Sequence, residues 1–596
     1  MDGPLAPAVR TRRTTAGDGV SLVVWEHGDP AARTVLAVHG YPDDHTVWDG
    51  VVALLAEKFH VVTYDVRGAG ESGAPAERAG YRLDQLADDL ATVLDAVSPD
   101  RPVHLLAHDW GSIQAWHALY TERLAGRVAS YTSISGPGLD HAGEWLRSRL
   151  RRPTPRRLRE LATQVAASGY IGYFQLPALP EWAWRSRVGA RMLRLVARGD
   201  AGLAAPKPAD AVRGLALYRE NMPSHLSGHA EGPDRARTTV PVQVLAPTRD
   251  PFVSTALQSD VARWSTEPRL RHIAGGHWVP RSRPDVIARC VTELAEHLAG
   301  GPDTRGLRRA AGRAAAAVSL RPNRHRHHGE LVVITGAGGG MGRATALGFA
   351  RRGADVVVAD IDEASAAETA RLVRDLGVRA GARRVDVADE PGMRAFAEAV
   401  LAEHGVPDVV VNNAGIGMAG AFADTTTADW RRVIDVNLWG VIHGCQVFSR
   451  PMVEQGEGGR IVNIASAAAY VPSRVLPAYA TIKSAVLMLS ECLRGELAEH
   501  GIGVVAVCPG LVHTNITATT TFVGADPAEQ SRRQQATFAA YRRRNFTPER
   551  AAEQIIRAAE RNTAVAPVTV EARVGLALSR LTPALLRAAA RREISL

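Results

Sequence analysis

Short apolar runs alternate with longer segments of helical periodicity along most of the chain. The runs TVLAV at 34–38, HVVTY at 60–64 and LVVIT at 331–335 are apolar at nearly every position rather than at every second one. This pattern predicts strands that are buried on both faces, as in a parallel sheet covered by helices on each side. It occurs in both halves of the chain without a fixed repeat, so we expect two unlike α/β folds.

The length and one break in composition predict where these folds begin and end. A chain of 596 residues exceeds the size at which a single hydrophobic core stops growing. Residues 301–328 are rich in alanine, arginine and histidine and poor in large apolar residues, which is more typical of a solvated, partly helical tether than of a binding patch. We expect one domain over 1–300, a basic linker over 301–328 and a second domain over 329–596.

The net charge of +9 at pH 7 narrows the choice of partners. Arginine dominates the basic residues and no basic motif is interleaved with aromatic residues, so we expect no nucleic-acid partner.

No apolar run approaches the roughly 20 residues of a membrane span, and the N-terminus lacks the apolar core of a signal peptide, which favours a cytoplasmic protein. In segment 570–596, apolar residues are paired with arginines, and we expect packing or an oligomer contact there, with a membrane-surface helix as the alternative.

The four cysteines do not form a recognisable set. Cys290, Cys445, Cys492 and Cys508 show no CxxC spacing. Neither a disulfide framework nor a metal site is therefore expected. We interpret all four as reduced thiols in the core.

The first half contains a nucleophile motif in which an aspartate takes the place of the usual serine. Asp109 lies in the sequence Ala-His-Asp-Trp-Gly directly after an apolar run. Small neighbours on both sides are typical of the sharp strand-to-helix turn that presents a nucleophile. Asp250 and His277 each follow a later predicted strand. An acid followed by a histidine is the order in which the other two members of a catalytic triad would follow such a nucleophile.

Residues 14–300 resemble the soluble epoxide hydrolases of the α/β-hydrolase fold. The resemblance includes the sequence HGYP, the aspartate motif and an insert at about 137–230 that would form a helical cap. It implies that Tyr170 and Tyr218 donate hydrogen bonds to the epoxide oxygen, with Tyr173 as the alternative to Tyr170. It also implies an oxyanion hole formed by the backbone N–H groups of Tyr41 and Trp110.

This chemistry explains the aspartate. A carboxylate that attacks an epoxide forms an ester, which water can hydrolyse, whereas a serine would form a stable ether. His277 would be the general base for that hydrolysis and Asp250 would orient it. The nearest alternative is a haloalkane dehalogenase, but Tyr41 replaces the asparagine that often binds halide in that family.

The second half begins with a glycine-rich turn between a predicted strand and a helix. Gly336, Gly340 and Gly342 would let the backbone approach a pyrophosphate at the helix N-terminus. Asp360 ends the next predicted strand, where it could bind both ribose hydroxyls and would repel a 2′-phosphate. We therefore expect NAD rather than NADP, although Arg343 would partly offset that repulsion.

Residues 329–560 resemble the short-chain dehydrogenase/reductase family. A serine, a tyrosine and a lysine follow in that family's order, and the four-residue Tyr–Lys spacing places both side chains on one helix face. The resemblance implies that Tyr479 exchanges a proton during hydride transfer, that Lys483 lowers the pKa of this phenol and holds the nicotinamide ribose, and that Ser466 binds the substrate oxygen. The other residues that it implies are Asn437 on a proton path, Asp386 and Asn413 near the cofactor, and Pro509, Gly510 and Thr514 in the nicotinamide-side loop.

Together the two halves resemble actinobacterial fusions of an epoxide hydrolase with a short-chain dehydrogenase. This resemblance implies hydrolysis of an epoxide to a vicinal diol and NAD(P)-dependent oxidoreduction of an alcohol or ketone. The apolar cap favours lipophilic small molecules as substrates. The family resemblance further implies a homo-oligomer formed through the dehydrogenase half. In the alternative, the oxidoreductase is active while the first half is dehalogenase-like or a catalytically silent binding module.

Overall fold

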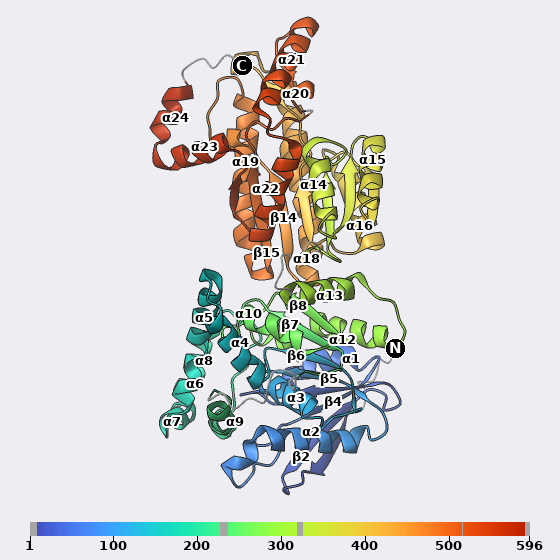
Figure 1. Ribbon diagram of the computed structural model, residues 1–596, viewed down its shortest axis with the longest axis vertical. Coiled ribbons are helices and arrows are strands. Elements are labelled where there is room, and N and C mark those ends of the chain that lie inside the picture. The colour runs from blue at the N-terminus through green and yellow to red at the C-terminus, as the bar shows by residue number, and fades with distance from the viewer. Residues whose placement is uncertain (1–8, 227–236, 319–325, 515, 591–596) are drawn as a thin grey trace, which may run out of the picture. The chain divides into compact units, whose positions relative to one another are not determined.

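The chain forms two compact units, residues 1–322 and 323–596 (Figure 1). The computed structural model describes residues 9–226, 237–318, 326–514 and 516–590. The last four residues of the predicted cap, part of the predicted linker and the C-terminal hexapeptide lie outside the described residues.

The N-terminal unit contains an eight-stranded sheet of order β1-β2-β4-β3-β5-β6-β7-β8, parallel except where β2 pairs with β1 and β4. Successive residues of β3 face opposite cores, with Leu36 packed on one side and Val35 on the other, so both faces are buried. The strands are β1 (Arg10–Thr15), β2 (Ser21–His27), β3 (Thr34–Val38), β4 (His60–Tyr64), β5 (Val103–His108), β6 (Val128–Ile134), β7 (Val242–Pro247) and β8 (Pro268–Ile273).

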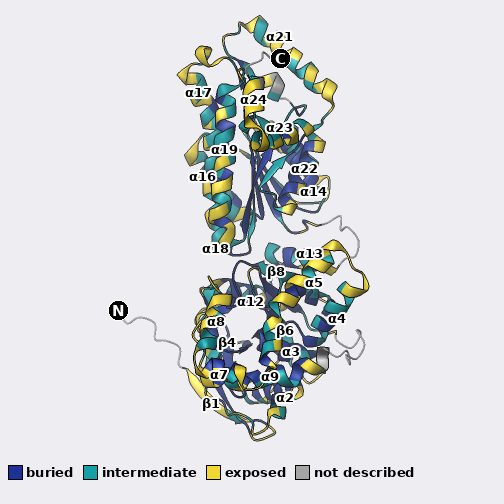
Figure 2. Cartoon of the chain, turned by 90° about the vertical axis from the view of Figure 1, so that its left-hand side faces the viewer, coloured by how far each residue is buried: buried dark blue, intermediate teal, exposed yellow. Residues whose placement is uncertain are grey.

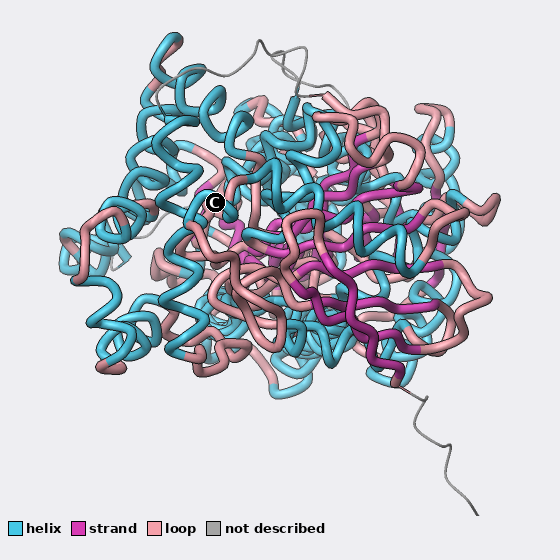
Figure 3. The backbone as a smooth tube through the Cα atoms, turned by 90° about the horizontal axis from the view of Figure 1, so that it is seen from below, coloured by secondary structure: helices cyan, strands magenta, loops and turns pink. Residues whose placement is uncertain are grey.

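Helices cover both faces of this sheet, and in Figure 3 they lie along the twisted strands. Residues of α2 and α3 share one core with the cap, and residues of α1 and α12 form the core on the other face. The helices outside the cap are α1 (Asp49–Leu55), α2 (Leu83–Val97), α3 (Trp110–Tyr120), α10 (Thr255–Val261), α11 (Val279–Ser282), α12 (Pro284–Leu298) and α13 (Arg305–Val318).

Six helices form an insert between β6 and β7, where the sequence predicts a cap. They are α4 (Leu139–Arg151), α5 (Pro155–Ala167), α6 (Gly169–Phe174), α7 (Leu179–Arg185), α8 (Val188–Val196) and α9 (Pro208–Leu226). Phe174 and Trp184 pack into the same core as the strand residues. The cap is therefore an integral part of this unit.

Half of the segment predicted as a linker is a packed helix. Helix α13 lies against β8 and buries Leu307, Ala310 and Ala314 at a spacing of three and four residues. Alanine is small enough to bring the helix backbone close to the sheet, so a segment with few large apolar residues still forms part of the N-terminal unit.

The C-terminal unit contains a seven-stranded parallel sheet of order β11-β10-β9-β12-β14-β15-β17, and β13 (Met418–Ala419) pairs with β16 (Thr521–Phe522) outside it. Helices α14, α15 and α22 share one core with it, and α16, α18 and α19 share the other. The sheet strands are β9 (Leu331–Thr335), β10 (Asp355–Asp360), β11 (Ala380–Arg384), β12 (Val409–Asn412), β14 (Gly459–Ile464), β15 (Ile502–Cys508) and β17 (Val565–Pro567). The helices are α14 (Gly340–Ala350), α15 (Glu363–Arg374), α16 (Glu390–His404), α17 (Thr427–Ile434), α18 (Gly440–Gln455), α19 (Pro477–Glu496), α20 (Ile516–Thr519), α21 (Pro527–Arg544), α22 (Pro548–Arg561), α23 (Val570–Leu581) and α24 (Pro583–Ala590).

Each sheet has one point at which the strand order reverses. The reversal lies between β3 and β5 in the first sheet and between β9 and β12 in the second. Loops that leave the carboxyl ends of such neighbouring strands diverge and leave a crevice, which is where open α/β sheets bind ligands.

Three of the four cysteines are buried, as expected for core thiols. Cys492 is exposed on α19, so the prediction of a core position is wrong for this residue.

Candidate active sites

Asp109 lies on a strained turn between β5 and α3. Its φ is 52° and its ψ is −124°, a conformation that costs energy for a residue with a side chain. A Cβ atom on Gly111 would lie less than 3.0 Å from the carbonyl oxygens of Val38 and His39, and one on Gly40 would lie 2.5 Å from the Asp109 side chain. The glycines therefore permit the close approach of strands that presents Asp109 at the crevice.

His277 lies between two carboxylates. Its Nε2 is 3.6 Å from Oδ2 of Asp109, and its Nδ1 is 3.0 Å from Oδ2 of Asp250. The other oxygen of Asp250 accepts hydrogen bonds from the backbone N–H groups of Phe252, at 2.8 Å, and Val253, at 3.0 Å. The three residues predicted as a triad are thus brought together, and Asp250 is held in an orientation that fixes the imidazole.

Burial and charge set the protonation states of this site. Burial raises the pKa of Asp109 to about 6, while the positive charge of His277 and two backbone N–H groups limit the rise. Burial alone would lower the pKa of His277, but Asp250 and Asp109 together raise it to about 9. The pKa of Asp250 is lowered because His277 outweighs the effect of burial. At neutral pH Asp109 is therefore ionised, as a nucleophile must be.

The predicted oxyanion hole faces the same carboxylate. The backbone N–H of Tyr41 donates to Oδ1 of Asp109 at 2.8 Å, and the backbone N–H of Trp110 also hydrogen-bonds this side chain. One donor follows β3 and the other begins α3, so they approach from both sides of the strand reversal.

Two of the three candidate cap tyrosines lie beside Asp109. Tyr170 on α6 and Tyr218 on α9 are hydrogen-bonded to each other, with ring centroids 5.8 Å apart. Burial and the charge of Asp109 raise both phenol pKa values, which keeps the phenols protonated as donors. The hydroxyl of Tyr173 instead faces the carbonyl of Leu179 at 3.5 Å, away from the triad.

His108 is a contributor to this site that the sequence analysis did not single out. Its ring is fully buried, with the centroid 4.7 Å from that of His277, and its Nε2 lies 2.9 Å from the backbone carbonyl of His277. Because a carbonyl only accepts, Nε2 carries the proton, and burial holds the pKa of His108 well below its usual value. Its position directly before Asp109 was the available signal.

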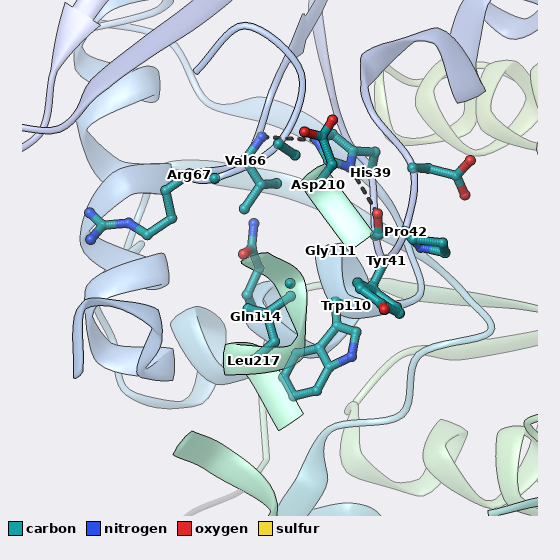
Figure 4. A pocket seen from close by; sticks show the side chains of 15 residues that line it. His39, Tyr41, Pro42, Val66, Arg67, Trp110, Gly111, Gln114, Asp210 and Leu217 are labelled. Atoms are coloured by element: carbon teal, nitrogen blue, oxygen red, sulfur yellow. Dashed lines mark hydrogen bonds between the residues drawn. The ribbon is translucent and has the colours of Figure 1, made fainter. Parts of the chain in front are cut away.

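A pocket lies between the turns after β3 and β4, the start of α3 and the cap helix α9 (Figure 4). It holds about 390 Å³ of empty space, part of it open to solvent. Its wall adjoins the elbow at Trp110 and Gly111, and Leu217 and Asp210 line it from the cap. The pocket therefore adjoins the elbow, although Asp109, Asp250 and His277 do not line it.

In the glycine-rich turn of the C-terminal unit, Gly336 and Gly342 have no room for a side chain. A Cβ on Gly342 would lie less than 3.0 Å from the carbonyl of Gly336, and one on Gly336 would lie 2.6 Å from Cα of Ala414. Gly336 and Gly340 also have positive φ values of 62° and 52°. This cradle at the start of α14 has the form that admits a pyrophosphate.

Asp360, at the end of β10, accepts a hydrogen bond from the backbone N–H of Gly338 at 2.8 Å, which ties it to the cradle. Arg343 donates to Oγ1 of Thr369 at 2.9 Å and to the carbonyl of Gly338. The basic side chain that could compensate a 2′-phosphate is therefore already engaged with its own turn.

The remaining predicted cofactor residues surround the ends of the central strands. Asn413 donates from its side chain to the carbonyls of Thr335, at 3.0 Å, and Gly336, at 2.8 Å. Asp386 is exposed, and Thr514 is buried with its Cβ 3.5 Å from where a Cβ on Gly340 would lie. Pro509 and Gly510 directly follow β15.

Ser466, Tyr479 and Lys483 converge where β14 meets α19. The Ser466 hydroxyl hydrogen-bonds the phenol of Tyr479, and Nζ of Lys483 lies 5.8 Å from the centroid of that ring. Lys483 donates to the carbonyl of Ile464 at 2.8 Å. Asn437, in a π-helical turn, exchanges two 2.9 Å hydrogen bonds with the backbone of Ile416.

One electrostatic prediction fails in this site. Burial raises the pKa of Tyr479 to about 12, and only the hydrogen bond from Ser466 limits the rise. Burial likewise lowers the pKa of Lys483 to about 8. We predicted that Lys483 would lower the phenol pKa, but desolvation dominates both groups.

Within residues 9–226, 237–318, 326–514 and 516–590, no three histidine, cysteine, aspartate or glutamate side chains gather as they would around a metal ion. No helix in the described ranges has the length and apolar character that a bilayer crossing needs.

Comparisons with known proteins divide the chain in the same way. Residues 33–280 match the family model described as alpha/beta hydrolase fold, and residues 330–522 match the model described as short chain dehydrogenase. The chain is 40% identical over 592 residues to the "Probable oxidoreductase EphD" of Mycobacterium tuberculosis, which covers 98% of this chain and 99% of that protein. These matches confirm both predicted fold classes.

Other similarities concern the C-terminal unit. The 3beta-hydroxysteroid dehydrogenase 1 of Eggerthella lenta is 37% identical over 191 residues, which are 32% of this chain and 73% of that protein. A crystal structure of a short chain dehydrogenase/reductase from Burkholderia phymatum in complex with NAD is 30% identical, with a TM-score of 0.42, and covers 45% of this chain and 99% of that one.

Proposed function

Because this chain belongs to the family of fusion proteins in which an α/β-hydrolase-fold domain precedes a short-chain dehydrogenase domain, we propose that it carries two reactions. The first is hydrolysis of an epoxide to a vicinal diol at Asp109. The second is NAD-dependent interconversion of an alcohol and a ketone at Tyr479. The lipophilic character of both substrates is part of the proposal.

In the first step a carboxylate oxygen of Asp109 attacks one epoxide carbon. The carbon–oxygen bond of the ring breaks, and the oxygen takes a proton from the pair formed by Tyr170 and Tyr218. The pKa of both phenols is raised by burial and by Asp109, so they remain protonated until the alkoxide forms. The product is an alkyl ester on Asp109.

Ester formation prepares His277 for the second step. It removes the negative charge of Asp109, which is one of the charges that raise the pKa of His277. The imidazole then releases its proton more readily; this proton re-forms the phenol of the tyrosine pair, and the neutral imidazole can accept one from water. The resulting hydroxide attacks the ester carbonyl, and the backbone N–H groups of Tyr41 and Trp110 stabilise the oxyanion. The intermediate then collapses: its hydroxyl proton passes to the leaving alkoxide, the diol departs and the carboxylate re-forms.

The C-terminal unit has the features that a dinucleotide requires. The cradle of Gly336 and Gly342 fits a pyrophosphate, and Asp360 beside it suits an unphosphorylated ribose. NAD would supply the hydride acceptor or donor. Tyr479 would move the hydroxyl proton, Ser466 would hold the substrate oxygen, and Asn437 would keep the π-helical turn in place through Ile416.

The observation that carries the hydrolase proposal is the arrangement of His277 between Asp109 and Asp250 under two cap phenols. A halide site is less well supported, because the Trp110 side chain is already hydrogen-bonded to Tyr218.

The proposal is tested by trapping the ester. In His277→Gln, incubation with aryl and long-chain epoxides should add the mass of one epoxide to the peptide that contains Asp109. Asp109→Asn should show no adduct, and His104→Gln, a change of a second buried histidine on β5, should turn over normally. If no epoxide gave the adduct, epoxide hydrolysis would be contradicted. It would also be contradicted if the protein instead released halide from haloalkanes and this release required Asp109 and His277.

The dehydrogenase proposal is tested with the diol products and with separate alcohols. NADH should form in Asp109→Asn but not in Tyr479→Phe. Tyr470→Phe is the matched control, because this tyrosine is bound to the carbonyl of Ala572 rather than to Ser466. NADH formation that survives Tyr479→Phe would place the chemistry elsewhere.

A further inference from the structure

The outer side of the cap carries an unusual group of exposed apolar side chains. Leu176, Leu179 and Trp182 on and before α7, and Met192, Leu195 and Val196 on α8, are between 45% and 72% exposed. We call this group the α7–α8 face. Both helices lie at the outer margin of the N-terminal unit, away from its sheet (Figures 1 and 2).

Helix α8 presents this face because its inner side is already occupied. Ala190 and Leu193 pack on the core of the unit, and none of its residues is buried. At 100° per residue, Met192 and Leu195 lie on the opposite side, and Val196 lies on the flank between the two sides. The exposed apolar surface therefore remains after the helix has been anchored.

Basic residues dominate the charge around the face. Residues 176–198 contain five exposed arginines and a single glutamate, Glu181, which binds Arg219 at 2.6 Å. Arg187, Arg191, Arg194 and Arg198 form no ion pair with any residue that the structure describes. Unpaired guanidinium groups around exposed leucine, methionine and tryptophan match a surface that is apolar inside and anionic at its boundary.

The same helix that carries the face also touches the catalytic centre. Trp184 on the inner side of α7 is buried, and its ring centroid lies 6.2 Å from that of Tyr41, whose N–H binds Asp109. A helix with its side chains is about 10 Å across. One helix thickness therefore separates the α7–α8 face from Trp184, which packs on the residue that binds the nucleophile.

We propose that the α7–α8 face docks the protein on an anionic lipid surface. A second copy of the chain is a poor occupant, because a two-fold contact through this face would bring the same arginines together. Docking in this way would let lipid-soluble molecules enter the cap from the membrane, a step that rests on the proposed epoxide hydrolysis.

Vesicle binding tests the docking without any substrate. The full chain is sedimented with vesicles of phosphatidylcholine alone and with vesicles that contain about one quarter phosphatidylglycerol. Binding should need the anionic lipid, should weaken in high salt, and should fall at least about tenfold in Arg191→Gln/Arg194→Gln, since each arginine near such a surface contributes roughly fivefold. Met192→Ser/Leu195→Ser should lose binding to a similar degree.

The matched control is another exposed apolar and basic surface, on the C-terminal unit. Val574 and Leu585, on α23 and α24, are 51% and 60% exposed in the segment where the sequence left a membrane-surface helix open. Val574→Ser/Leu585→Ser and Arg573→Gln/Arg580→Gln should bind vesicles as the wild type does. The proposal would be overturned if these variants lost vesicle binding while the cap variants kept it. It would also be overturned if the wild type, the cap variants and these variants all bound vesicles equally.

A second readout guards against unfolded variants and against self-association. Brominated lipids should quench tryptophan fluorescence more in the wild type than in Trp182→Phe. The cap variants should keep the wild-type unfolding midpoint and oligomeric state. A change of oligomeric state in the cap variants, with no vesicle binding by the wild type, would assign the face to a protein contact. Vesicle binding without diol formation would instead refute only the proposed hydrolysis.

Discussion

At the scale of single residues, Asp109 combines burial of a charged group with backbone strain. Its carboxylate is buried, its backbone is strained, and its compensation is limited to two N–H groups and the charge of His277. Natural active sites often retain such costs because catalysis requires the strained group. The cost should be measurable as stability.

We predict that Asp109→Asn stabilises the N-terminal unit at pH 7.5. A pKa raised to about 6 means that stability present below the unfolded-state pKa is lost as the pH rises through 6. Two pK units correspond to roughly 3 kcal/mol, and the gain should be about 1–2 kcal/mol, because the variant also removes a charge that favours protonated His277. Urea unfolding should show that Asp109→Asn is more stable than the wild type at pH 7.5 and that this difference is smaller at pH 5. An equal difference at the two pH values would contradict the prediction.

The pKa of Asp109 also predicts a pH profile. The rate of ester formation in His277→Gln should rise with pH as Asp109 ionises and should level off at pH values above the pKa of Asp109. That variant lacks the cation that limits the pKa of Asp109, so its midpoint should lie above about 6. Rapid-quench mass measurement between pH 5 and 9 gives the profile, and a rate independent of pH would exclude Asp109 as the titrating nucleophile.

His108 should affect hydrolysis of the ester more than its formation. His108→Phe keeps a ring beside His277 but removes the N–H that binds its backbone carbonyl. Displacement of His277 should slow ester hydrolysis about tenfold or more and leave ester formation within a few-fold. His104 lies on the same strand as His108 and makes a comparable side-chain hydrogen bond, to Ser130 on β6. His104→Phe removes that bond and should change neither step. Equal effects of the two variants would indicate a merely structural role for His108.

At the scale of elements, the turn from β5 to α3 depends on glycines rather than on its nucleophile. Gly111→Ala would place a Cβ against the carbonyls of Val38 and His39, which belong to rigid backbone. We expect a loss of about 2 kcal/mol or more and no ester formation. Gly172→Ala on α6 meets no atom within 4 Å and should be neutral or stabilise by up to about 1 kcal/mol. Thermal unfolding and ester trapping of both variants measure the difference.

At the scale of the whole molecule, each unit has its own buried cores and its own site at a strand reversal. A ligand that binds one folded unit stabilises that unit by mass action. NAD⁺ at 100 times its dissociation constant should therefore stabilise the C-terminal unit by about 2.7 kcal/mol and leave the other unchanged. Calorimetry measures this as an NAD⁺-dependent rise in the unfolding temperature of the C-terminal unit, which Asp360→Ala should lose. A rise in the unfolding temperature of both units would contradict the prediction.

The sequence alone determined the features that depend on contiguous residues. The aspartate turn, the glycine-rich cradle and the Tyr–Lys pair each need particular residue types at fixed local spacing, so their chemistry can be inferred before the fold is known. The order of Asp109, Asp250 and His277 was equally informative, because parallel strands end at one edge of a sheet.

Only the tertiary structure decided which surface covers each amphipathic face. Tyr170 and Tyr173 lie three residues apart on one helix, and packing on Tyr218 selects the first. Helix α13 is buried by β8 although its composition indicates a solvated tether, and the apolar side of α8 remains exposed. Periodicity shows that such a face exists, but its partner is set by contacts between residues far apart in the chain. The same long-range burial raises the pKa of Tyr479 and lowers that of Lys483.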